Sequence, residues 1–308
     1  IPTLYSGDNY KNVNLFTGDV NLDFDLLQVD GPLLSYSLNA FYNSRGAGIT
    51  PLFTQNALGG LGWKLMDYPK IAYDAVDTTY YLLDGYQAHP LKRLSQTGTT
   101  AQYAAPGSFH LWSITMGNLQ PQTGNLTWQL VSDDGTQYRF TAPAMNHLDN
   151  NQPGYLWNLS MIRETQGRDS ILFNYQNGSL QQIQTSDLNT WNFSYDGSSR
   201  ISTIENVIAS TSAGTQYPQS QMQLTYGSTF PGTNFTQLSS ISYLQNVAPP
   251  PYTQAQYQAA APPVYFRYNT TNYPGALESM QAPQGGAVEY RYTLLPVQFR
   301  QYQIRSEE

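Results

Sequence analysis

The side chains that could do chemistry in this chain are few, and their spacing does not favour catalysis. The three histidines, His89, His110 and His147, are far apart, and none has the His-x-x-x-His spacing that brings two imidazoles to one metal. Asp133 and Asp134 are adjacent in an Asp-Gly turn, whereas glycosidases need two carboxyl groups that face one bond across a cleft. We therefore expect no catalytic residue, no metal site and no cofactor.

Two other stretches have residue types that can bind ions. Asp19, Asp23 and Asp25 line one face of a predicted strand, where carboxylates can hold calcium, although a solvated strand face explains them better. The stretch GGLGWKL (59–65) is rich in glycine, but no strand–loop–helix frame surrounds it. A close approach of two strands, with Trp63 packed on a neighbour, is a better interpretation than a phosphate site.

Aromatic residues make up 14% of the chain, and 25 residues are Tyr. Several of them could form platforms on which the rings of a bound sugar stack. These candidates are Tyr80, Tyr81, Trp112, Trp128, Trp157 and Trp191. In proteins rich in β-strands, aromatic side chains more often pair across strands and fill the core, and we favour that interpretation.

The composition argues against several classes of partner and location. Charged residues make up only 11% of the chain and the net charge is −7, so there is no basic stripe for nucleic acid. The chain has no Cys, which excludes disulfides and thiolate metal sites. No apolar run reaches the roughly 18 residues of a membrane-spanning helix. Polarity that comes mostly from Asn, Gln, Ser and Thr is commoner outside cells, and we expect a secreted or cell-surface protein from a bacterium.

The elements that must position any site are predicted to be β-strands. Apolar and polar residues alternate in VNLDFDLL (20–27) and LLSYSLNAFYNS (33–44), with a VDGP turn between them, which predicts a hairpin. TWQLVSDDGTQYRF (127–140) predicts a second hairpin around its Asp-Gly turn. No segment has a convincing helical pattern, and the Pro-rich stretch 245–263 is expected to be an exposed loop.

From residue 155 onward, hairpins of one kind follow one another. Each has a strand that ends in apolar-x-Tyr, a turn, and a return strand with Leu or Ile three residues apart, as in ILFNYQNGSLQQI (171–183). The repeat tyrosines are Tyr175, Tyr195, Tyr226, Tyr268 and Tyr292. Because no hairpin can bury its own apolar face, we expect neighbours to stack and share one face.

These repeats resemble a known family. The segments FNYQNGSLQQI, FSYDGSSRISTI and FRYNTTNYPGALESM resemble the YD repeats of RHS-type proteins, in which a Tyr-Asp or Tyr-Asn pair precedes a turn. The N-terminal part is similar to the opening of RHS and insecticidal-toxin B/C shell proteins. Its matching positions are Thr17, Gly18, Tyr42, Asn43, Gly60, Gly62 and Trp63.

The resemblance implies an all-β fold in which antiparallel hairpins stack into a curved or spiral sheet; a β-propeller or a β-sandwich is the alternative. It also implies a non-catalytic structural protein that acts as a shell wall, a surface module or a self-associating extracellular assembly. The family's Asp-Pro-x-Gly-Leu autoproteolytic element has no match here, so self-cleavage is not carried over. Because a closed shell generally takes a longer chain, a fragment of a toxin-encapsulating shell is a further alternative.

Partners and domain organisation complete these expectations. Few charges protect the predicted strand edges, so we expect pairing with further copies into a homo-oligomer or filament, or with the remainder of a longer shell. A carbohydrate-binding or carbohydrate-cleaving β protein, with glycans as partners, is the competing function. The change to regular repeats predicts two parts, 1–154 and 155–308, unless the chain is one continuous unit.

Overall fold

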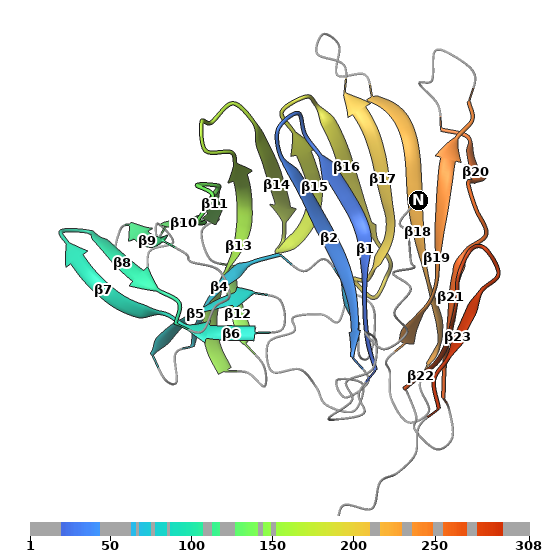
Figure 1. Cartoon of the computed structure of the whole chain (residues 1–308), viewed down its shortest axis with the longest axis horizontal. Helices are drawn as coiled ribbons and strands as arrows, with labels where there is room; N and C mark the ends of the chain where they lie inside the picture. The colour runs from blue at the N-terminus through green and yellow to red at the C-terminus, as the bar shows by residue number, and fades with distance from the viewer. Residues whose placement is uncertain are drawn as a thin grey trace, which may run out of the picture.

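The computed structural model contains strands, turns and loops but no helix among the residues that it describes (Figure 1). The described residues are 20–43, 63–65, 68–74, 78–84, 87–106, 113–117, 127–140, 144–148, 152–209, 216–229, 236–248, 255–269 and 276–291. Within them, no helix is long and apolar enough to cross a membrane. The prediction of an all-β fold is confirmed.

The first three strands form a separate sheet, the N-terminal sheet. β1 (Asn21–Asp30) and β2 (Ser35–Asn43) form the predicted hairpin, and β3 (Trp63–Leu65) pairs with the end of β2. Alternation puts Leu22, Leu26 and Leu38 in the core with exposed fractions of 3% or less. The alternating apolar residues from which the hairpin was predicted are therefore the residues that it buries.

All other strands belong to two sheets that share one long strand, β13 (Gln152–Arg163). The first part of β13 pairs with β12 and β4, and its last part pairs with β11 and β14. The strands before it are β4 (Lys70–Asp74), β5 (Thr79–Asp84), β6 (Gln87–Pro90), β7 (Lys92–Thr97), β8 (Thr100–Ala104), β9 (Ser113–Gly117), β10 (Thr127–Val131), β11 (Gln137–Phe140) and β12 (Ala144–Leu148). β13 thus crosses the predicted boundary near residue 155, and the division into 1–154 and 155–308 stays a prediction.

The strands after β13 extend the larger sheet hairpin by hairpin. They are β14 (Ser170–Gln176), β15 (Ser179–Thr185), β16 (Asn189–Tyr195), β17 (Ile201–Ala209), β18 (Gln216–Thr229), β19 (Thr236–Asn246), β20 (Tyr257–Ala259), β21 (Val264–Tyr268), β22 (Leu277–Gln281) and β23 (Ala287–Glu289). Among the described strands, none pairs β7 at one end of this sheet with β23 at the other. The sheet is therefore open, and antiparallel throughout, as predicted.

Each regular strand pair has a β-bulge at the same place. Phe173 pairs with Ile183 and Tyr175 pairs with Leu180, so the return strand carries one extra residue between these pairs. The extra residue turns Leu180 and Ile183 to the same face, although strict alternation would put residues three apart on opposite faces. The same shift recurs beside Phe140, Tyr195, Tyr226 and Tyr268. The three-residue spacing in the sequence is thus the signature of a repeated bulge.

The N-terminal sheet covers the apolar face of the repeats. The ring of Tyr36 contacts Phe173 edge-on at 6.0 Å between centroids, and Trp63 packs on Phe266 at 4.8 Å. Figure 1 shows β1 and β2 lying across the strands of the repeat region. The buried side chains of both layers form one hydrophobic core. The first strands of the chain therefore shield the apolar face of the repeat hairpins from water.

One turn between repeat strands holds a strained residue. Ser199 has a φ of 60°, and it occupies the place that Gly285, with a φ of 87°, has in the turn before β23. Because a left-handed backbone costs a residue with a Cβ more than it costs glycine, we expect Ser199→Gly to stabilise the fold by about 0.5 kcal/mol. The reverse change, Gly285→Ser, should destabilise it by about 1 kcal/mol. Urea unfolding of both variants checks this, and a loss of stability in Ser199→Gly would contradict it.

Candidate functional site

The repeat tyrosines form a ladder of hydrogen bonds that joins each hairpin to the one before it. Each hydroxyl donates to the main-chain carbonyl of the residue that pairs, at the preceding bulge, with the preceding tyrosine or with Phe140. The four bonds join Tyr175 to Leu159 (2.8 Å), Tyr195 to Leu180 (2.6 Å), Tyr226 to Ile201 (2.7 Å) and Tyr268 to Leu238 (2.5 Å). We call this set the tyrosine ladder.

The tyrosine ladder uses the irregular points of the sheet. Leu180, which accepts from Tyr195, is also the residue that pairs with Tyr175 at the bulge of its own hairpin. A bulge interrupts the regular main-chain bonding of a strand pair, and buried carbonyls need donors. The hydroxyl of the next hairpin supplies a donor there, so each bulge is tied to its neighbour.

Burial keeps these hydroxyls protonated. Desolvation raises the pKa of Tyr175 and Tyr268 well above the ordinary value for tyrosine, and it is also the main cause that raises the pKa of Tyr195 and Tyr226. A group that must donate a hydrogen bond has to keep its proton. The buried position of each rung therefore keeps its donor proton in place at neutral pH and above the ordinary pKa of tyrosine.

The N-terminal sheet closes the C-terminal end of the tyrosine ladder. The indole N–H of Trp63 donates to the Tyr268 hydroxyl at 2.6 Å, and the N–H of Leu277 donates to the Tyr42 hydroxyl at 2.7 Å. The rings of Tyr42 and Trp63 contact each other at 5.3 Å. Two positions of the predicted N-terminal motif, Tyr42 and Trp63, are thus brought to the repeat of Tyr268. At the other end, Phe140 takes the tyrosine's place beside its bulge.

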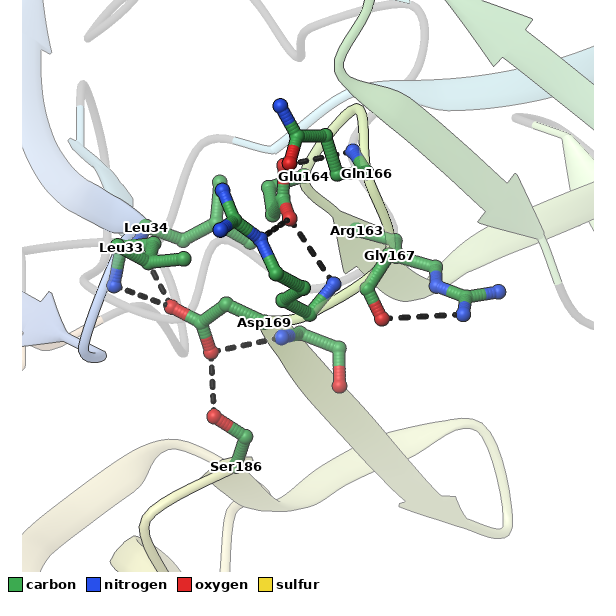
Figure 2. A network of polar contacts seen from close by, with 10 residues as sticks. Leu33, Leu34, Arg163, Glu164, Gln166, Gly167, Asp169 and Ser186 are labelled. Carbon is green, nitrogen blue, oxygen red and sulfur yellow. Dashed lines mark hydrogen bonds and ion pairs between the residues drawn. The ribbon is translucent and has the colours of Figure 1, made fainter.

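A buried carboxylate holds the other end of the N-terminal sheet (Figure 2). Asp169, directly before β14, is only 2% exposed, and its side chain accepts the N–H groups of Leu33 at 2.6 Å and Leu34 at 2.7 Å. It also accepts the N–H of Ser170 at 2.7 Å and a short bond from the Ser186 hydroxyl. We call this arrangement the Asp169 clamp, because it fastens the β1–β2 turn to the repeat sheet.

The glycine of that turn is required by the carboxylate. A Cβ on Gly31 would lie 2.9 Å from Oδ2 of Asp169, closer than a carbon and an oxygen approach each other. Next to the clamp, Glu164 accepts the N–H groups of Gln166 and Arg168 at 2.7 and 2.9 Å and shapes the loop before β14 (Figure 2). Carboxylates here build turns by accepting main-chain donors.

The clamp favours the ionised carboxylate. Desolvation raises the pKa of Asp169, but the bonds from Ser186, Leu33, Leu34 and Ser170 together hold this pKa below the ordinary value. The stability that Asp169 contributes is therefore full above the ordinary carboxyl pKa, and it is lost as the pH falls through the lowered one.

Several candidates of the sequence analysis lie in the core or in turns. Trp128, Trp157 and Trp191 have exposed fractions of 1%, 0% and 5%, so no sugar can stack on them here, in agreement with the packing interpretation. Asp134 accepts the Ser132 hydroxyl and the N–H of Thr136 and serves its turn. His89 is buried on β6. In the part of the chain that the structure describes, no group of three acidic or histidine side chains could hold a metal.

The side chains of several other predicted positions lie outside the part of the chain that the structure describes. Asn43, Asp23, Asp25 and His147 lie on described strands, but their side chains are outside the described set. The remaining positions outside the described residues are Thr17, Gly18, Asp19, Gly60, Gly62, His110, Trp112 and Tyr292.

The sequence analysis did not find the Asp169 clamp. One signal was available: Asp169 stands directly before a strand, in a chain with only 21 acidic residues. Nothing near it in sequence indicates its partners Leu33 and Leu34, which lie 136 and 135 residues away. The contact of Tyr42 with Leu277 was missed for the same reason.

These features define a class of protein by fold: an open antiparallel sheet of bulged hairpins, tied by a tyrosine ladder and covered by an N-terminal sheet. No family model matches the sequence, and no curated protein matches it. A solved structure of the Tc holotoxin pore from Photorhabdus luminescens, in a mutant form, matches with a TM-score of 0.60 and 13% identity. The match covers 82% of this chain and 16% of that chain, so this chain spans about 16% of the length of its relative.

A second solved structure, a porin-like protein from Bacteroides uniformis, aligns over 78% of this chain and 94% of its own with 9% identity. Its TM-score of 0.26 is too low to carry an argument. The likeness to part of the Tc holotoxin therefore shows a shared fold and nothing more, and this fold agrees with the predicted shell-type sheet.

Proposed function

We propose that this chain is a non-catalytic wall segment of a larger β shell of the RHS/YD-repeat type, secreted or exposed at a cell surface. The observation that carries the proposal is the tyrosine ladder, whose four bonds join successive hairpins into one continuous sheet. Buried hydrogen-bond networks of this kind specify and rigidify a structure. Membership of the family and enclosure of a toxin belong to the proposal; the fold shared with a holotoxin chain supports them.

The absence of catalysis is part of the proposal. The carboxylates of Asp134, Glu164 and Asp196 each accept main-chain N–H groups of their own turns, and Asp169 accepts those of the β1–β2 turn. These carboxylates are fixed by their hydrogen bonds, and they stabilise the turns whose N–H groups they accept. This use of acidic side chains supports a structural role over carbohydrate cleavage.

The two ends of the open sheet differ in how well they resist pairing. β7 carries exposed Lys92 and Arg93 and a bulge between Arg93 and Ser95, which are devices that protect an edge strand. The expectation that few charges guard the edges therefore does not fit β7. β23, by contrast, ends the described sheet with Ala287, Val288 and a single acidic residue. We infer that further copies, or further repeats of a longer shell, add at β23.

Light scattering during size-exclusion chromatography of the purified chain tests assembly. If the chain self-associates at β23, its apparent mass should rise above 34.5 kDa as the concentration increases. Ala287→Lys should weaken this association by placing a charge on the edge, while Ser95→Lys on β7 is the matched control and should leave it unchanged. A monomer at every concentration would contradict self-association, as would equal effects of both substitutions.

A further inference from the structure

The hairpin of β7 and β8 extends beyond the hydrophobic core. On β8, Ala101 and Tyr103 are buried, with exposed fractions of 1% and 7%, whereas all six side chains of β7 are exposed. β7 is held by its pairing with β8, and Figure 1 shows this hairpin projecting from the rest of the molecule. The side chains of β7 therefore add nothing to the core and are accessible to a partner.

A β-bulge lies at the most exposed leucine of the described residues. Leu94 is 62% exposed, and it lies between Arg93 and Ser95, where the pairing of β7 with β8 is shifted. A bulge breaks the alternation of a strand and redirects a side chain. Since burying a leucine is favourable, Leu94 offers an apolar anchor on a strand that the core does not need.

Two cations stand next to Leu94 without an acidic partner. Lys92 and Arg93 are exposed, and neither forms an ion pair with any residue that the structure describes. The guanidinium group of Arg200, by contrast, lies 2.6 Å from a carboxylate of its own turn. Nη1 of Arg93 donates to Oε1 of Gln96 at 3.0 Å, which holds this guanidinium group along the strand. Both charges are therefore left for a partner to neutralise.

This part of the chain differs in charge from the rest. Residues 85–132 contain Lys92 and Arg93 but no Asp or Glu. Because these two cations are included in the net charge of −7, all other residues together carry −9. Charges at a surface act over only about 8 Å at physiological salt, so an acidic partner is attracted at this hairpin and repelled by most of the remaining surface. Nucleic-acid binding rests on many phosphate contacts, which two cations do not provide.

We propose that the β7–β8 hairpin binds an acidic polypeptide segment, whose carboxylates pair with Lys92 and Arg93 and whose apolar side chain covers Leu94. The bulge and the cations hinder the addition of a further strand to β7, so the contact is made by side chains and not by main-chain pairing. The site includes no residue of the tyrosine ladder, the Asp169 clamp or β23. It is therefore independent of the proposed wall function and of assembly at β23.

Fluorescence anisotropy of the whole chain with the labelled peptide Ser-Glu-Glu-Leu-Glu-Glu-Ser tests the proposal. We expect this acidic peptide to bind, and the matching peptide with Lys in place of Glu not to bind. The double variant Lys92→Glu/Arg93→Glu should weaken binding of the acidic peptide at least tenfold and should bind the basic peptide instead. Leu94→Ser should weaken binding of the acidic peptide roughly tenfold, because it removes the apolar anchor.

Matched variants elsewhere on the surface separate this site from general charge and apolar effects. Arg267→Glu changes an exposed cation on β21, and Leu33→Ser changes an exposed leucine of the β1–β2 turn. Both should bind the acidic peptide like the wild type. Urea unfolding of the β7 variants should match that of the wild type, since every side chain of β7 is exposed. A loss of binding is then not a loss of folding.

Three results would overturn the proposal. The first is that the acidic peptide does not bind at millimolar concentration. The second is that the double variant or Leu94→Ser binds this peptide as tightly as the wild type. In the third, vesicles of phosphatidylglycerol bind the chain with the same dependence on Lys92, Arg93 and Leu94 while the peptide does not. That outcome would assign the hairpin to an anionic membrane surface.

Discussion

Asp169→Ala is expected to lower the free energy of unfolding by about 3 kcal/mol, because it leaves the N–H groups of Leu33, Leu34 and Ser170 without their acceptor. The loss is large because the carboxylate is 2% exposed, so that water cannot easily replace it. It should also release the β1–β2 turn from the repeat sheet. Urea denaturation followed by tryptophan fluorescence measures the change.

Two comparisons show whether the carboxylate itself is responsible. Asp169→Asn keeps the shape of the side chain but places an amide N–H₂ group where a carboxylate oxygen accepts an N–H group. It should therefore lower the free energy of unfolding nearly as much as Asp169→Ala. The difference in stability between this variant and the wild type should shrink as the pH falls through the lowered pKa of Asp169. Asp133→Ala removes an exposed turn carboxylate and should cost less than about 0.5 kcal/mol. A wild-type stability for Asp169→Asn would contradict the clamp.

Tyr268→Phe is expected to lower the free energy of unfolding by about 2–3 kcal/mol, since one hydroxyl serves two bonds. It donates to the carbonyl of Leu238 at 2.5 Å and accepts the indole N–H of Trp63 at 2.6 Å. A rung with a single bond, Tyr195→Phe, should cost about 1–2 kcal/mol. Chemical denaturation of both variants gives the two values.

The exposed Tyr265, three residues away on the same strand, offers the matched control for this rung. Tyr265→Phe should change stability by less than about 0.5 kcal/mol. If Tyr268→Phe cost no more than Tyr265→Phe, the tyrosine ladder would be an incidental contact and not a tie between hairpins.

Local pattern was enough to predict the strands but not how they are held together. Alternation predicted the β1–β2 hairpin, and the apolar-x-Tyr ending predicted the regular repeats. The three-residue spacing of Leu180 and Ile183 contained more information than the sequence analysis took from it. Residues three apart can share a strand face only across a bulge, so the bulge was predictable from that spacing alone.

Contacts between distant segments could not be predicted in this way. The partners of Asp169 and Tyr42 lie more than a hundred residues away, and no local preference records such a distance. The aromatic surplus predicted a core or a sugar platform without deciding between them. Burial assigns Trp128, Trp157 and Trp191 to the core, and the half-buried Tyr80 packs against that core.

Native-state hydrogen exchange of the wild type and of Tyr226→Phe, a rung in the middle of the repeats, tests most directly whether the hairpins act as one wall. A coupled sheet predicts slow exchange throughout β14–β19 in the wild type, and faster exchange in the variant that extends through β15–β19. Faster exchange confined to β17 and β18 would contradict it, because each hairpin would then be stable by itself.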